Sequence, residues 1–94
     1  MARIAVTDGM DAKAIQSLIN AGHEVIERHY SKEELVNGAL AGFDAVIVRS
    51  ATKMTSEVIS SSNGLSFIGR GGVGVDNIDI DAATNQGIVV CNTP

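Results

Sequence analysis

Short apolar runs alternate with helix-forming segments along the whole chain, and this alternation most constrains how the chain can fold. The apolar runs span residues 3–7, 24–28, 43–49, 66–69 and 87–91. Strands that alternate with helices in this way are joined by right-handed crossovers and lie parallel to one another. The pattern therefore predicts an α/β fold with a five-stranded parallel sheet.

Capping signals begin the helical segments between these runs. The candidate N-cap residues are Asp11, Ser31, Thr55, and Asp79 or Asn77. Ser31 lies three residues before Glu34, which is the spacing of a capping box. The first helix is predicted to carry Ile15, Leu18 and Ile19 on one face. For five strands connected by helices we expect the flavodoxin-like, doubly wound order 2-1-3-4-5.

The composition is typical of one small domain with an aliphatic core. The chain has 94 residues, of which 45% are hydrophobic and only 3% aromatic, and its net charge is −4. Nucleic-acid binding rests on clustered cations, and a membrane span needs about 20 apolar residues, so neither partner is expected. We therefore expect a soluble, cytoplasmic protein. Cys91 lies within an apolar run, which predicts a buried, reduced thiol.

A glycine-rich run, residues 69–74, follows the fourth apolar run. Its Gly69-x-Gly71-x-x-Gly74 spacing has the letters of the dinucleotide-binding fingerprint. That fingerprint follows the first strand, opens directly into a helix and precedes an acidic residue about 20 positions later, and none of these conditions holds here. The amide groups of such a run can instead form a concavity that accepts an oxyanion. A tight turn without a ligand is the alternative.

Polar residues are expected where the third, fourth and fifth strands end. Arg49 and Ser50 end the third run, Arg70 follows the fourth and Asn92 follows the fifth, so these residues are expected to share one edge. Ligands of doubly wound sheets bind outside the carboxyl ends of the strands. Two arginines beside a concavity of amides suit a ligand with an anionic group at each end. The alternative is that both arginines form surface ion pairs with acidic residues within 76–81.

Acid–base machinery is not evident in the sequence. His23 and His29 lie in the amino-terminal half, far from the glycine-rich run, and neither is assigned a catalytic role. The spacing of the residues indicates no Ser-His-Asp set, no Cys-His set and no metal-binding cluster. We therefore predict a binding edge with no catalytic residue and no metal.

Four stretches of the chain resemble the D-isomer-specific 2-hydroxyacid dehydrogenases. They are residues 48–55, 68–79, 82–84 and 87–94, in the same order as in that family. The resemblance implies that residues 1–94 form the N-terminal part of a substrate-binding domain. It also implies that a nucleotide-binding domain with the true dinucleotide fingerprint, and the family's catalytic residues, follow Pro94.

The resemblance assigns substrate-binding roles to Arg49, Ser50, Arg70, Val73, Gly74 and Asn92. Arg49 and Ser50 would help to hold the substrate, and the amides of Val73 and Gly74 would receive its carboxylate. The other two residues would line the cleft. The backbone of Val73 would also lie near the nicotinamide of NAD, which would be bound mainly by the nucleotide-binding domain.

The Val-Arg-Ser-Ala-Thr-Lys run at 48–53 is most typical of the family members that oxidise 3-phospho-D-glycerate. The implied activity is the NAD-dependent oxidation of this acid to 3-phosphohydroxypyruvate, which leads to L-serine. The implied whole enzyme is a homo-oligomer through other regions, and residues 1–94 alone are expected to be inactive. Two alternatives stay open: another D-2-hydroxyacid dehydrogenase, such as a glyoxylate or hydroxypyruvate reductase, and a non-catalytic flavodoxin-like binding module.

Overall fold

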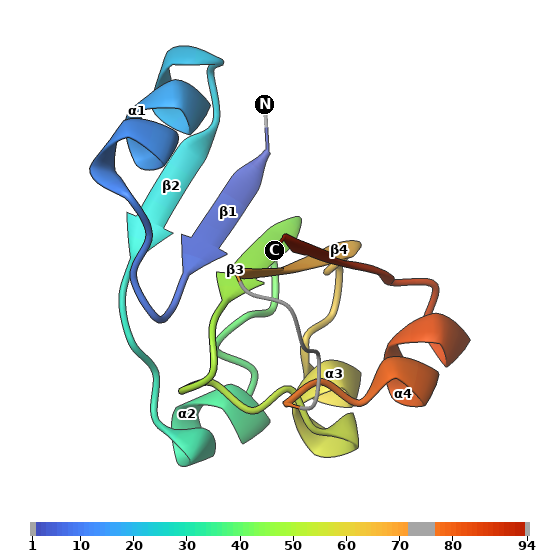
Figure 1. Ribbon diagram of the computed structural model, residues 1–94. Coiled ribbons are helices and arrows are strands. Elements are labelled where there is room, and N and C mark those ends of the chain that lie inside the picture. Colours follow the sequence, from blue (N-terminus) through green and yellow to red (C-terminus); the bar gives the residue numbers. More distant parts are fainter. Residues whose placement is uncertain (1, 72–76, 94) are drawn as a thin grey trace.

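Five parallel strands and the helices between them make up the protein, as the alternation of apolar runs predicts. The computed structural model describes residues 2–71 and 77–93. The elements in chain order are β1 (Arg3–Val6), α1 (Ala12–Asn20), β2 (Glu24–Glu27), α2 (Lys32–Val36), β3 (Ala45–Val48), α3 (Ser56–Ser61), β4 (Phe67–Gly71), α4 (Ile80–Asn85) and β5 (Val89–Thr93). The strands are ordered β2-β1-β3-β4-β5 and every neighbouring pair is parallel (Figure 1), which confirms the predicted α/β fold and strand order.

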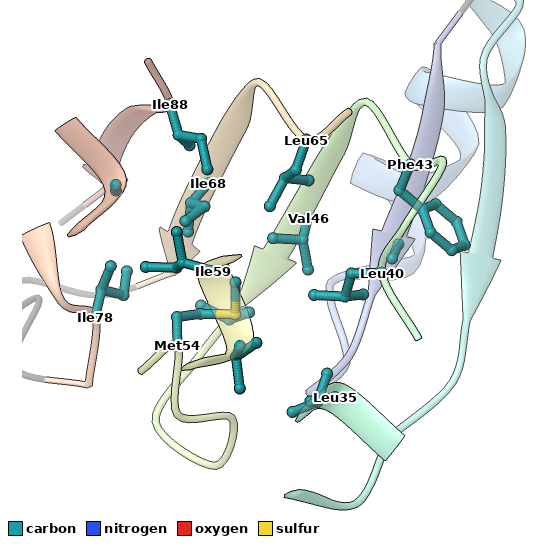
Figure 2. Close-up of a cluster of buried hydrophobic side chains, with 14 of the residues drawn as sticks. Leu35, Leu40, Phe43, Val46, Met54, Ile59, Leu65, Ile68, Ile78 and Ile88 are labelled. Atoms are coloured by element: carbon teal, nitrogen blue, oxygen red, sulfur yellow. The ribbon is translucent and has the colours of Figure 1, made fainter. Parts of the chain in front are cut away.

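The main core lies between the sheet and one layer of helices. Buried side chains of α2, α3 and α4 share a single apolar cluster with side chains of β1, β3 and β4. Figure 2 shows Val46 of β3 and Ile68 of β4 within this cluster, on the side of the sheet where Ile59 of α3 lies. Val46 and Ile68 are completely buried. Because side chains alternate between the faces of a strand, every second residue of these strands contributes to this core.

Helix α1 lies beside β2, apart from the layer formed by the other helices (Figure 1). Of the three residues predicted to form its apolar face, only Ile15 is buried, and Ile19 is 46% exposed. The helix contacts β2, the terminal strand at that end of the sheet, and buries only a narrow apolar stripe there. None of the described helices has the length and apolar character needed to cross a membrane.

The capping predictions are confirmed for three of the helices. Ser31 forms the complete capping box with Glu34, and Thr55 accepts a hydrogen bond from the Val58 N–H. Of the two candidates for α4, Asp79 is the N-cap residue, and its carboxylate accepts the Ala82 N–H. Asp11 occupies the N-cap position of α1, but its side chain makes no capping hydrogen bond, so that part of the prediction is wrong.

Strands β4 and β5 both run two residues further than predicted. The sequence prediction ended them at Gly69 and Cys91, whereas their pairing continues through Gly71 and Thr93. Arg70 therefore lies within β4 rather than after it, and Asn92 lies within β5. Glycine weakens a strand because it has no side chain to pack. Here β4 nevertheless stays paired in register with β3 and β5 at Gly69, and with β5 at Gly71.

Cys91 is exposed, which contradicts the predicted buried thiol. Its side chain alternates to the face of the sheet opposite the α2–α4 layer, where Val89 of the same strand is 57% exposed. On that face α1 packs at the β2 end of the sheet, so β5 has no helix over it in the described part of the chain. An apolar run indicates a strand, but it does not show which of the two faces another element covers.

We expect the core side of the sheet to dominate stability. Replacing Ile68 by alanine removes a fully buried side chain and leaves a cavity, so Ile68→Ala should lower the free energy of unfolding by about 2–5 kcal/mol. Ile19→Ala removes a half-exposed side chain and should cost less than about 1 kcal/mol. Urea unfolding followed by circular dichroism measures both, and equal losses would contradict the proposed location of the core.

Candidate functional site

The carboxyl ends of β3, β4 and β5 bring the predicted binding residues to one edge of the sheet. Val48 of β3 is paired in register with Arg70 of β4, and Arg70 with Asn92 of β5. Arg49 and Ser50 directly follow Val48 and are exposed. The prediction that Arg49, Arg70 and Asn92 share one edge is therefore confirmed. Their roles toward a substrate stay predictions.

The two arginines approach this edge from opposite faces of the sheet. The Arg49 side chain lies on the face of the sheet toward which a side chain at position 71 would point. A Cβ atom at Gly71 would lie 3.6 Å from Cγ of Arg49, so the arginine side chain runs beside bare backbone. Arg70 alternates to the other face, where its Nε donates a hydrogen bond of 2.7 Å to Oδ1 of Asn77. The guanidinium groups thus flank the end of β4.

A cavity of about 530 Å³ opens at this edge, on the sheet face that α2–α4 leave uncovered. Its lining residues are Gly9, Met10, Asp11, Ile47, Arg49, Phe67, Gly69, Arg70, Gly71 and Cys91. Cavities of this size hold small organic ligands, which are usually oriented by a few polar groups above an apolar floor. The charged residues of the lining are Arg49, Arg70 and Asp11, and of the two arginines it is Arg49 whose side chain lies on the same face of the sheet as the cavity.

The glycines of β4 have a packing role that the motif letters do not reveal. A Cβ atom at Gly69 would lie 3.0 Å from the Phe67 ring, so the ring rests over backbone that only glycine leaves open. Gly69 and Gly71 lie inside a strand and not at a turn that opens a helix. They therefore do not form a dinucleotide-binding turn, which agrees with the rejection of the fingerprint from the sequence. The amide concavity predicted at Val73 and Gly74 lies outside the described residues.

The alternative reading of the arginines as surface ion pairs is not favoured for Arg49. Among residues 2–71 and 77–93, the ion pairs that involve arginine are Arg3–Glu24, between β1 and β2, and Arg28–Glu34, between the end of β2 and α2. Asp79, one of the proposed partners, instead caps α4. The carboxylate at position 76, another proposed partner, lies outside the described residues.

Asp8 is a component of this edge that the sequence analysis missed. Its side chain is only 3% exposed, and its Oδ2 accepts the backbone N–H groups of Arg49 and Thr52 at 2.7 and 2.9 Å. The Thr52 hydroxyl donates to Oδ1 at 2.6 Å, and Nδ1 of His29 lies 3.3 Å from the same oxygen. The Asp8-Gly9 pair reads as a turn, and no local signal shows that the carboxylate binds a segment about 40 residues away.

The ionisation of Asp8 follows from these contacts. Burial disfavours the charged carboxylate, but the hydrogen bonds from the Thr52 hydroxyl, the two backbone N–H groups and His29 outweigh it and hold the pKa of Asp8 below its usual value. The segment after β3 is therefore bound to a carboxylate that is ionised at neutral pH.

A family model for the D-isomer-specific 2-hydroxyacid dehydrogenase catalytic domain matches residues 4–94, which is nearly the whole chain. The chain belongs to this family. Its members are NAD-dependent dehydrogenases.

Relatives from distant organisms carry the same segment. The chain is 44% identical over 93 residues to D-3-phosphoglycerate dehydrogenase of Sus scrofa and 45% identical over 94 residues to that of Methanocaldococcus jannaschii. These matches span 98% and 100% of this chain but only 17% and 18% of the two relatives. The chain thus spans about a sixth of the length of these family members.

Solved structures superpose on nearly the whole chain. The PH0520 protein of Pyrococcus horikoshii has a TM-score of 0.89 and 31% identity, over 99% of this chain and 28% of that protein. The 3-phosphoglycerate dehydrogenase of Entamoeba histolytica, solved with NAD⁺ bound, has a TM-score of 0.82 and 38% identity, over 99% of this chain and 33% of that enzyme. The α/β fold described above is therefore the family's fold.

The contribution of Asp8 to stability should depend on pH. A carboxyl group whose pKa is lower in the folded than in the unfolded chain stabilises the fold above its unfolded value of about 3.9, and this stabilisation is lost as the pH falls through the folded value. Asp8→Asn should therefore lower the free energy of unfolding by about 1.5–3 kcal/mol near pH 6. The difference from the wild type should shrink toward pH 3.

Urea unfolding of both proteins at intervals from pH 6 to pH 3 measures this difference. A difference that stays constant over the whole range would show that the charge of Asp8 contributes nothing to holding the segment after β3.

Proposed function

We propose that this chain is the N-terminal part of the substrate-binding domain of an NAD-dependent D-3-phosphoglycerate dehydrogenase. The reaction would be the oxidation of 3-phospho-D-glycerate to 3-phosphohydroxypyruvate, on the route to L-serine, in the cytoplasm. Relatives of that name at 42–45% identity over essentially the whole chain support the assignment. A nucleotide-binding domain that follows Pro94 would complete the enzyme.

The observation that carries the proposal is the pair of arginines at the end of β4, beside a cavity of about 530 Å³. 3-Phospho-D-glycerate has a carboxylate at one end and a phosphate at the other. Guanidinium groups present forks of N–H donors that match both kinds of anion. Two such groups that flank one strand end, from opposite faces of the sheet, are suited to a molecule with two separated negative charges.

In this proposal, the residues of the chain bind and orient the substrate. Arg49 and Ser50 hold it, the amides of Val73 and Gly74 receive its carboxylate, and Arg70 and Asn92 line the cleft. The floor of Ile47 and Phe67 would exclude water from one side of the molecule. These roles rest on the common carboxyl edge of β3, β4 and β5 and on the resemblance of these positions to the family.

NAD, when bound, accepts the hydride that leaves C2 of the hydroxy acid. Gly69 and Gly71 lie within β4, against the side chains of Phe67 and Arg49, so they offer no turn for its pyrophosphate. We therefore place the cofactor mainly on the nucleotide-binding domain, with the backbone of Val73 near the nicotinamide. The proton acceptor also belongs to that part of the enzyme, and residues 1–94 alone should show no turnover.

The proposal is tested with the full natural protein that contains this chain. NADH formation from 3-phospho-D-glycerate should be faster than from D-glycerate, which lacks the phosphate. Arg49→Gln should raise the KM for 3-phospho-D-glycerate by about 10–100-fold, because it removes a charged donor pair, and should leave the KM for NAD unchanged.

Arg28→Gln is the matched control. Arg28 is an exposed arginine that is paired with Glu34 and does not line the cavity, so its loss should leave both KM values unchanged. Equal or better oxidation of an unphosphorylated 2-hydroxy acid would contradict the assignment and favour another member of the family. Measurable NADH formation by residues 1–94 alone would contradict the division of roles.

A further inference from the structure

The segment that carries Arg49 and Ser50 is held at both of its ends by two side chains from distant parts of the chain. The carboxylate of Asp8 accepts the N–H groups of Arg49 and Thr52, at 2.7 and 2.9 Å. The amide nitrogen of Asn77 donates to the carbonyl groups of the same two residues, both at 2.6 Å. One carboxylate therefore binds both N–H groups, and one carboxamide binds both carbonyls, of residues 49 and 52.

We call this arrangement the 49–52 clamp, and the two side chains that form it are buried. The Asp8 side chain is 3% exposed and Asn77 as a residue is 8% exposed. A buried polar group that loses its partner is costly, so each bond of the clamp restricts the segment strongly. The exposed side chains of Arg49 and Ser50 thus project from a backbone that is held in one position.

Asn77 is itself anchored through its backbone. The Met54 N–H donates to the Asn77 carbonyl at 2.8 Å, and Met54 forms a parallel bridge with Ile78. Met54 and Ile78 both belong to the buried core cluster and are labelled in Figure 2. The clamp is therefore attached to the main core rather than to an exposed loop.

Asn77 also links the two arginines. Its Oδ1 accepts Nε of Arg70 at 2.7 Å, while its Nδ2 binds the carbonyl of Arg49. A carboxamide is the side chain that suits this position, because it offers donors in one direction and an acceptor in the other. Asn77 is not needed as a helix cap, since Asp79 performs that role for α4.

We propose that Asp8 and Asn77 are positioning residues, which set the distance and orientation of Arg49 and Arg70 toward a small doubly charged acid. Neither residue need touch the ligand: Asp8 acts through the backbone of residues 49 and 52, and Asn77 acts through that backbone and through the guanidinium of Arg70. This inference rests on the proposed function, and it assigns to two residues a role in substrate affinity that the motif resemblance does not give them.

Two isosteric variants of the full natural protein test the proposal. Asp8→Asn removes the negative charge and one acceptor, and Asn77→Asp keeps an acceptor for Arg70 but cannot donate to the two carbonyls. Each should raise the KM for 3-phospho-D-glycerate by about tenfold, which is the factor expected for the loss of one charged hydrogen bond. The KM for NAD should stay unchanged.

Asp44→Asn is the matched control for Asp8→Asn. The Asp44 carboxylate accepts the backbone N–H of Arg3 at 2.7 Å, which is the same kind of bond at the opposite end of the same two strands. Its loss should affect stability but not the KM for 3-phospho-D-glycerate. If Asp44→Asn raises that KM as much as Asp8→Asn, the effect is one of general destabilisation and the proposal is wrong.

Hydrogen exchange at the amides of residues 49 and 52 gives a readout that does not depend on turnover. Exchange should be faster in Asp8→Asn and unchanged in Asp44→Asn. Faster exchange with an unchanged KM would overturn the proposal, because the clamp would then have only a structural role. Unchanged exchange would overturn the clamp itself.

The activity of the wild-type protein distinguishes the two hypotheses. A wild-type protein that forms no NADH from 3-phospho-D-glycerate contradicts the proposed function and leaves the clamp testable. In that case titration of wild type and variants with inorganic phosphate, followed by NMR, replaces the KM. Weaker phosphate binding in both clamp variants than in Asp44→Asn supports the positioning role, and equal binding overturns it.

Discussion

Backbone hydrogen bonding in one parallel register across β3, β4 and β5 is the constraint on which the rest of the structure depends. It places Val48, Arg70 and Asn92 side by side, and so brings residues that are up to 44 positions apart in the sequence to one edge. Parallel strands all end at the same edge, where doubly wound folds bind their ligands. The position of the cavity is thus a consequence of topology, and its charge is a consequence of the residues at the strand ends.

At the same edge, side-chain hydrogen bonds restrict the polar segment that follows β3. The segment after β3 has no regular structure through which to satisfy its backbone groups, and two buried side chains bind them instead. An ionised carboxylate accepts hydrogen bonds from N–H groups, and the NH₂ of a carboxamide donates them to carbonyl groups. The bonds connect the segment after β1, the segment after β3 and the segment before α4, so the edge is held by contacts between residues distant in sequence.

Much of the fold could be predicted because its signals are local. Alternating apolar runs and capping residues such as Ser31 and Thr55 depend on neighbours within a few positions, and each was confirmed. The extension of β4 through Gly71 and the exposure of Cys91 depend on what lies beside or above the strand, which the sequence does not state. The prediction that Arg49 and Arg70 share an edge succeeded because strand order alone decides it.

The roles of Asp8 and Asn77 could not be predicted from the sequence for the same physical reason. The neighbouring residues indicate a turn at Asp8 and a possible helix cap at Asn77, because such interpretations depend only on adjacent positions. Their actual partners lie about 40 and 25 residues away. An aspartate or asparagine near the end of a strand is ambiguous until the neighbouring segment is known, because such side chains bind backbone groups in many settings.

The most direct measurement is an NMR titration of the ¹⁵N-labelled protein with 3-phospho-D-glycerate, with D-glycerate as the comparison. We expect small but saturable chemical-shift changes of the Nε–H signals of Arg49 and Arg70 and of the amides of residues 49–52, larger for the phosphorylated acid. Shifts confined to other surfaces, or no shift at millimolar concentrations of the acid, would contradict the claim that this edge binds an anionic small molecule.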